Sequence, residues 1–118
     1  MKRGEIWTIA GGADHMGKPR PAVIVQDDAF DATASLTVCA FTSDPSDAPL
    51  FRLLVTPSEI NGLAAPSRMM VDKITTAPKS KFGAKVGRLA NEDMLRLDRV
   101  MLAFLGLAVA PARREKDP

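Results

Sequence analysis

The sequence predicts a small domain of mainly β structure, an antiparallel sheet or barrel capped by one C-terminal helix. Two observations favour this class. Short apolar runs alternate with polar, turn-forming segments through most of the chain, and a helical repeat of apolar residues follows them. A length of 118 residues suits one domain with a single core. We expect that domain to span residues 1–110, followed by a flexible tail over 111–118 that is charged and bounded by proline.

Five strands are expected where β-branched, aromatic and other apolar residues gather between turn-forming residues. Pro21 suits the first position of its run, where a missing amide donor is tolerated. Asn61-Gly62 is a strong turn signal between the fourth run and the fifth. The expected strands are Glu5–Ile9, Pro21–Val25, Leu36–Phe41, Phe51–Val55 and a fifth that begins at Met69 and reaches Ile74 or beyond.

One helix is expected over Asn91–Leu105, with Asn91 as its N-cap and Gly106 at its end. Its apolar residues recur at helical spacing and form a stripe that should pack on the sheet. The residues of this stripe are Met94, Leu97, Met101 and Phe104.

The composition is that of an ordinary globular protein, with 46% hydrophobic and 25% charged residues. No apolar run is long enough to cross a bilayer, and the first residues lack the apolar core of a signal peptide, so we expect a cytoplasmic protein without membrane contact. The single cysteine, Cys39, excludes an internal disulfide and is expected to be a small buried hydrophobe. Cysteine and histidine are too few for a structural zinc site, and we expect neither a metal nor a cofactor.

The net charge is only +2, but the charges are unevenly distributed along the chain. An acidic stretch from Asp27 to Glu59 contains Arg52 as its only base. A basic stretch follows, and a cluster of this kind can attract phosphates, although a solvated charged surface is the commoner explanation. Its basic residues are Lys73, Lys79, Lys81, Lys85 and Arg88.

The most informative motif is Lys18-Pro19-Arg20-Pro21-Ala22-Val23-Ile24-Val25, which places Arg20 where a loop enters a buried strand. A guanidinium anchored there and open to solvent suits phosphate binding, because it offers a planar fork of donors. The alternative is an arginine that pairs with a carboxylate to fix the loop. Thr42 has a similar place at the end of the third run, where a hydroxyl that caps a turn is the alternative.

The chain as far as about Leu107 resembles the MazF/PemK toxins, the mRNA interferases. Each matching motif is weak alone, but all of them occur in order in a chain of the right length. The motifs are Arg3-Gly4-Glu5-Ile6-Trp7, Arg20-Pro21-Ala22-Val23-Ile24-Val25, Phe41-Thr42-Ser43, Asn61-Gly62-Leu63, Ser67, Val71-Asp72-Lys73-Ile74, Lys79-Ser80-Lys81-Phe82-Gly83, Val86-Gly87-Arg88-Leu89 and the final helix.

This resemblance implies an SH3-like antiparallel barrel of the CcdB/MazF type that forms a homodimer. It implies a sequence-specific, metal-independent endoribonuclease that cleaves single-stranded RNA and is neutralised by an acidic antitoxin protein. The family's catalytic arginine and threonine carry over as Arg20 and Thr42. The residues expected to bind the flanking RNA are Lys18, Ser43, Lys73, Lys79 and Lys81.

The sequence departs from the family pattern at two positions. Some members carry a glutamate in the first loop, where this chain has Asp14 and His15, so either of these is a candidate general base, or neither is. Many members have Asp-Gln in the fifth strand, where this chain has Asp72-Lys73. Lysine cannot offer the paired donor and acceptor of an amide to a base.

Two other functions stay open at this point. The first is a CcdB-like toxin that binds DNA gyrase without catalysis, although the Trp-Gly-Ile of that family's terminal helix is replaced here by Leu105-Gly106-Leu107. The second is an inactive family member that only binds RNA or antitoxin.

Overall fold

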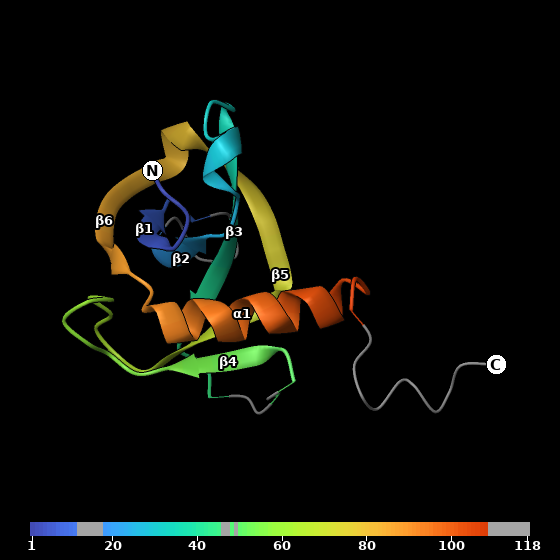
Figure 1. The fold of residues 1–118 in the computed structure, drawn as a ribbon. Helices are drawn as coiled ribbons and strands as arrows, with labels where there is room; N and C mark the ends of the chain where they lie inside the picture. The colour runs from blue at the N-terminus through green and yellow to red at the C-terminus, as the bar shows by residue number, and fades with distance from the viewer. Residues whose placement is uncertain (12–17, 46–47, 49, 109–118) are drawn as a thin grey trace.

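A computed structural model describes residues 1–11, 18–45, 48 and 50–108. Within these residues six strands form one antiparallel sheet, in the order β4-β5-β3-β2-β1-β6, and helix α1 lies against it (Figure 1). The predicted class of mainly β structure with a C-terminal helix is confirmed. The elements are β1 Glu5–Ile9, β2 Arg20–Ile24, η2 Asp28–Phe30, β3 Ser35–Thr42, β4 Arg52–Val55, β5 Ser67–Pro78, η3 Lys79–Lys81, β6 Phe82–Arg88 and α1 Asn91–Phe104.

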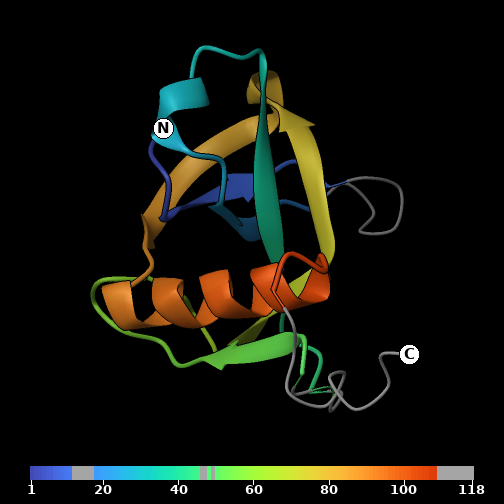
Figure 2. The same cartoon turned by 45° about the vertical axis from the view of Figure 1, so that its right-hand side comes forward.

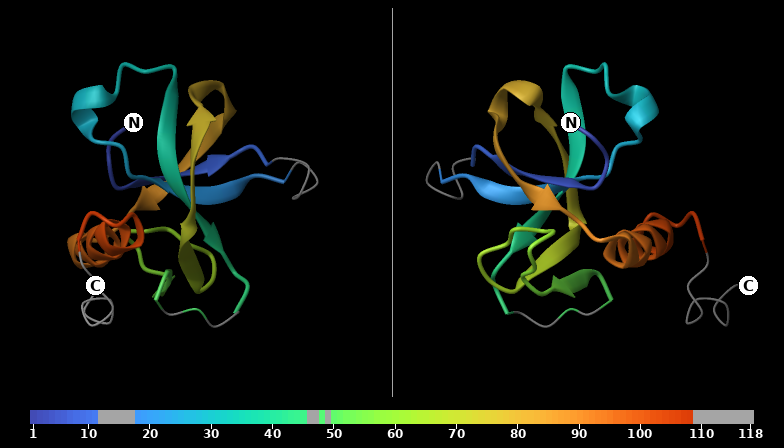
Figure 3. Two further views of the ribbon diagram at one scale, coloured as in Figure 1. Left: turned by 90° about the vertical axis from the view of Figure 1, so that its right-hand side faces the viewer. Right: turned by 60° about the vertical axis from the view of Figure 1, so that its left-hand side comes forward.

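The sheet is strongly coiled, so β1 and β2 run across the direction of β3 and β5 (Figure 3). Among the described strands, β4 and β6 remain the two edges and do not pair with each other. The predicted barrel is therefore an open one.

Coiling buries both faces of the two central strands β2 and β3. Val23 and Cys39 belong to a main core beneath the helix, while Ala22 and Val38 belong to a second cluster on the other face. This explains why residues 21–25 and 36–41 are continuous apolar runs instead of alternating ones. The main core consists of Ile6, Val23, Cys39, Phe41, Leu53, Val55, Leu63, Met69, Val71, Leu89 and Leu97.

Helix α1 crosses the sheet near β4 and β5 (Figure 2). Leu97 is fully buried, and Met94 and Met101 pack beside it, as the apolar stripe predicts. Phe104 remains about half exposed and contacts the ring of Phe51 at a centroid distance of 5.9 Å. The predicted stripe therefore faces the core over its first three positions and reaches the core's edge at the fourth.

The two ends of α1 differ in how well the sequence predicts them. The N-cap prediction was wrong by one residue: Ala90 is the cap, no side chain caps the helix, and Asn91 is the first helical residue. Gly106 ends the helix as predicted, with a φ of 76°. The amides of Gly106 and Leu107 donate to Ala103 and Leu102, which satisfies two of the last carbonyls.

Strand β6 was not predicted, because its glycines, alanine and lysine lack a strand pattern. It forms because β1 offers a free edge, against which Arg88 and Gly87 pair with Glu5 and Ile6. Its first residue, Phe82, lies edge-on to the half-buried Trp7 at 6.3 Å. The Trp7 indole packs against the second cluster and donates to Glu5 Oε1 at 3.0 Å, so its main role is structural.

The Asn61-Gly62 turn is locked against β6. Asn61 is 3% exposed, and its side chain bonds the backbone of Ser58, Leu63 and Thr56 at 2.9, 3.0 and 2.9 Å. Gly62 has a φ of 67°, and a Cβ there would lie 2.1 Å from the carbonyl oxygen of Val86. Both the backbone conformation and the close approach require glycine.

We predict that Gly62→Ala lowers the free energy of unfolding by at least about 2 kcal/mol, because the turn must move away from β6. Thermal unfolding measures this. The matched control is Gly106→Ala, whose φ is 76° but whose Cβ would meet nothing within 4 Å. Equal losses in the two variants would mean that backbone strain, and not the contact with Val86, accounts for the effect.

Candidate active site

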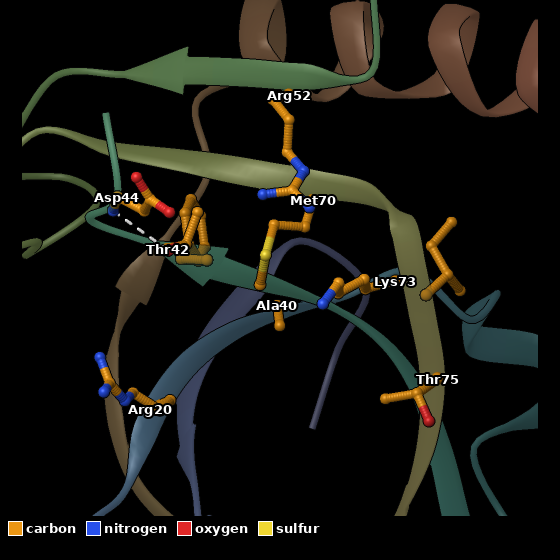
Figure 4. Close-up of a pocket in the computed structure, with 10 residues that line it drawn as sticks. Arg20, Ala40, Thr42, Asp44, Arg52, Met70, Lys73 and Thr75 are labelled. Atoms are coloured by element: carbon orange, nitrogen blue, oxygen red, sulfur yellow. Dashed lines mark hydrogen bonds between the residues drawn. The ribbon is translucent and has the colours of Figure 1, made fainter. Parts of the chain in front are cut away.

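A hollow of about 600 Å³ opens where β2 begins and β3 ends, beside β4 and the middle of β5 (Figure 4). A volume of this size lies within the range of roughly 300–1,000 Å³ that ligand sites occupy. The residues that line the hollow are Arg20, Ala40, Phe41, Thr42, Asp44, Arg52, Met70, Lys73, Ile74 and Thr75. Three of the residues predicted from the sequence, Arg20, Thr42 and Lys73, therefore meet in one place.

Arg20 is the first residue of β2, flanked by Pro19 and Pro21 and paired in register with Ile9. Its backbone is thus fixed by the sheet while its side chain is exposed. The guanidinium lies on a different side of the hollow from Arg52 (Figure 4). An anchored guanidinium at the rim that is open to solvent is accessible to a phosphate and can bind it through two parallel hydrogen bonds.

Thr42 is the last residue of β3 and is half-buried. Its Oγ1 accepts a hydrogen bond from the amide of Asp44 at 3.1 Å, which fixes the turn that follows the strand. The predicted turn-capping role of this hydroxyl is therefore present. A hydroxyl that accepts one bond still has its own O–H to donate, so the same side chain can also serve a phosphate oxygen.

Lys73 is exposed on β5 and lines the same hollow. Two acidic residues lie nearby: Asp44 lines the hollow, and Asp72 is bonded by Arg52. The Arg52 guanidinium holds the pKa of the Asp72 carboxyl below its usual range, through hydrogen bonding more than through charge alone. Asp72 is therefore ionised at neutral pH and is a weak base.

The sequence analysis did not predict Arg52 or Asp44 in this region, and it named Asp72 only as part of the Asp72-Lys73 motif, without its ion pair to Arg52. One signal existed, since Arg52 is the only base in the acidic stretch from Asp27 to Glu59. Whether Arg52 reaches the hollow depends on which strand β4 pairs with, and the order of the strands is not visible in the sequence.

The other predicted RNA-binding residues do not line this hollow. Lys18 and Ser43 are exposed and adjoin its rim in sequence, two residues before Arg20 and one after Thr42. Lys79 and Lys81 lie in η3, beyond the far end of β5, where Lys79 Nζ donates to the Asp31 carbonyl. The candidate bases Asp14 and His15 lie outside the described residues.

Cys39 is buried as predicted, and burial, with a smaller contribution from Asp72, raises the pKa of its thiol to about 12. The thiol therefore stays protonated and unreactive at neutral pH. No cluster of three or more His, Cys, Asp or Glu side chains suited to a metal ion occurs in the described ranges. Nor does any helix in them have the length and apolar character to cross a membrane.

A family model described as PemK-like, MazF-like toxin of type II toxin-antitoxin system matches residues 2–105. The probable endoribonuclease MazF of Mycolicibacterium smegmatis is 52% identical over 108 residues, which are 92% of this chain and 99% of the relative. The chain belongs to the PemK/MazF toxin family. The endoribonuclease MazF9 of Mycobacterium tuberculosis is 27% identical over 117 residues, covering 91% of this chain and 98% of the relative.

The PemK/MazF fold is also found by structural comparison. The solved structure of an endoribonuclease in complex with its cognate antitoxin from a mycobacterial species has a TM-score of 0.77 and covers 93% of this chain and 99% of its own. The two chains are 22% identical. The predicted family and fold are thus confirmed, and in this member Arg20 and Thr42 converge from separate strands.

Proposed function

We propose that this protein is a metal-independent endoribonuclease toxin that cleaves single-stranded RNA at short sequence motifs. The observation that carries the proposal is the convergence of Arg20 and Thr42, from the start of β2 and the end of β3, in one hollow. Membership in the PemK/MazF family and the 52% identity to a probable endoribonuclease MazF support the activity.

In the proposed reaction the substrate supplies its own nucleophile. The RNA 2′-hydroxyl attacks the adjacent phosphorus, the bond from phosphorus to the 5′-oxygen breaks, and the products are a cyclic phosphate and a 5′-hydroxyl. A base takes the proton of the 2′-hydroxyl, and the departing 5′-oxygen gains one. Arg20 binds a non-bridging oxygen and neutralises the developing charge, while Thr42 donates a hydrogen bond to the phosphate.

The proposed partners follow from the family. We expect a homodimer in the cytoplasm that is silenced by an acidic antitoxin, consistent with the cognate antitoxin bound to the mycobacterial endoribonuclease. Lys18, Ser43, Lys73, Lys79 and Lys81 remain the residues expected along the RNA. Lys73 is the best supported of these, because it lines the hollow itself.

The deciding experiment incubates the purified protein with mixed RNA, with and without EDTA. Cleavage in both samples supports the proposal. Cleavage only without EDTA indicates a metal-dependent nuclease, and RNA binding without cleavage indicates an inactive member. Inhibition of gyrase supercoiling without effect on RNA would indicate a CcdB-like toxin, which the match to the PemK/MazF model makes the weaker candidate.

The identity of the general base is a separate prediction. If His15 is the base, the cleavage rate should rise with pH through a pKa of about 6.5, and His15→Gln should lower it roughly 10²–10⁴-fold. If Asp14 is the base, the rising limb lies at lower pH and Asp14→Asn gives the loss. If both variants cleave within a few-fold of the parent's rate, neither residue is the base. Arg20 and Thr42 would then carry the chemistry largely through positioning and charge.

A further inference from the structure

Arg52 and Asp72 form a two-bond ion pair at the edge of the hollow. Arg52 is the first residue of β4 and pairs in register with Met70 of β5. Asp72 lies two residues beyond Met70, hence on the same face of the sheet, at the diagonal position that long side chains can reach. Arg52 Nε donates to Asp72 Oδ1 at 2.7 Å, and Nη2 donates to Oδ2 at 2.9 Å.

This geometry engages only one side of the guanidinium. A guanidinium carries five N–H groups. Two of those of Arg52 are bonded to Asp72 in the described part of the chain. The other three, both on Nη1 and one on Nη2, lie on the outer side, and the Asp44 carboxylate, which lines the hollow, also acts on Arg52 through its charge. Arg52 lines the hollow, whereas Asp72 does not. The close-up shows the guanidinium reaching from β4 over the hollow, with a terminal nitrogen directed toward the side where Thr42 lies (Figure 4). The Asp72 carboxylate therefore holds the Arg52 guanidinium from the side that faces away from the hollow.

Attachment of β4 to the sheet does not by itself require this ion pair. The backbone of β4 pairs with β5 over four positions, and Val71 N donates to the Phe51 carbonyl at 3.0 Å. Helix α1 adds another contact, since Arg96 Nη2 donates to the Leu54 carbonyl at 2.7 Å. The charged residues that line the hollow besides Arg52 are Arg20, Lys73 and Asp44, so cations outnumber carboxylates there by three to one. A fixed guanidinium that faces such a hollow has the geometry of an anion-binding group.

We propose that Arg52 is a second phosphate-binding residue of this site and that Asp72 is the positioning residue that holds its guanidinium toward the hollow. The identification of the phosphate as one in RNA rests on the proposed function. Arg20 then binds the scissile phosphate and Arg52 binds a neighbouring one. Two fixed cations on different sides of the hollow keep the strand splayed for in-line attack.

The first test replaces Arg52 and measures binding and cleavage separately. The binding probe is single-stranded 2′-O-methyl RNA of mixed sequence, which keeps its phosphates and cannot be cut by 2′-attack. Loss of one phosphate contact in Arg52→Gln should reduce the log–log salt slope of binding by about 0.7. It should also lower kcat/KM for RNA by about 10- to 100-fold. Arg52→Lys should be impaired as well, because lysine cannot bond Asp72 at two points and a phosphate together.

Asp72→Asn separates positioning from charge. If only net charge matters, removing a carboxylate should tighten RNA binding and leave kcat unchanged. If Asp72 positions Arg52, kcat should fall by about tenfold while KM stays level or decreases. The double variant Arg52→Gln/Asp72→Asn should be no slower than Arg52→Gln, since both changes act on one guanidinium.

Arg96→Gln is the matched control, because Arg96 also bonds a carboxylate and holds β4 but lies outside the hollow. It should keep the parent's salt slope and kcat/KM. Parent-like slope and kinetics in Arg52→Gln would overturn the proposal, as would identical behaviour of Arg52→Gln and Arg96→Gln. If the parent binds the probe but cuts no RNA, the proposed function fails. The difference in salt slope between the parent and Arg52→Gln then still decides the role of Arg52. A parent that does not bind the probe overturns the role proposed for Arg52, and cleavage of unmodified RNA still decides the proposed function.

Discussion

Replacing Arg20 with alanine should lower RNA cleavage by at least about 10²–10³-fold, the usual effect of removing one group that stabilises transition-state charge. The fold should persist, because Arg20 is exposed and its side chain belongs to neither core cluster. Initial rates with a fluorogenic single-stranded RNA measure the first effect. Circular dichroism and thermal unfolding measure the second.

Arg20→Lys should recover little of this activity, since a point charge replaces the planar fork. The control is Arg99→Ala, which removes an exposed arginine from α1, away from the hollow. It should cleave RNA at the parent's rate. Parent-like cleavage by Arg20→Ala would remove the basis for the site, and an equal loss in Arg99→Ala would point to net charge instead of a specific contact.

Local sequence patterns predict most of this fold because its strands are bounded by clear turn signals. β1, β2, β3, β4 and β5 all overlap their expected ranges, Asn61-Gly62 lies in the connection between β4 and β5, and Gly106 ends α1 as predicted. The patterns fail where an element depends on its neighbour. β6 has little strand propensity of its own and exists because β1 presents an unpaired edge.

The same distinction applies to the site. Arg20 and Thr42 could be singled out because each lies at the end of an apolar run and matches a family motif. The pair Arg52–Asp72 could not, because it depends on the register of β4 against β5, two strands separated by the turn at residues 56–66. The register of β3 against β5 also shifts between Cys39, which pairs with Ile74, and Phe41, which pairs with Met69, so the extra residues of this irregularity, within 70–73, belong to β5. No local pattern reveals which residues such an irregularity turns toward the hollow.

The largest effect of all is expected from a change in the substrate. Replacing the ribose at the cut position with 2′-deoxyribose removes the proposed nucleophile, so cleavage there should lose the whole enzymatic acceleration, at least on the order of 10⁶-fold. Binding should change little, because every phosphate for Arg20 and Lys73 remains. The parent RNA and its singly substituted partner are compared at equal enzyme concentration, with the cut position first mapped on the parent.

The end groups of the products give an independent measurement of the same chemistry. Attack by the 2′-hydroxyl must leave a cyclic phosphate, or the 3′-phosphate formed from it, on one fragment and a 5′-hydroxyl on the other. Mass spectrometry and labelling by polynucleotide kinase distinguish these ends, and the rate should be the same with EDTA present. A strict magnesium requirement would contradict a metal-independent reaction. Cleavage of the deoxy-substituted RNA, or fragments that begin with a 5′-phosphate, would each show that the 2′-hydroxyl is not the nucleophile. The reaction would then need a water molecule beside Arg20 and Thr42, activated by a metal or by a base. The reaction proposed for this hollow uses no such water.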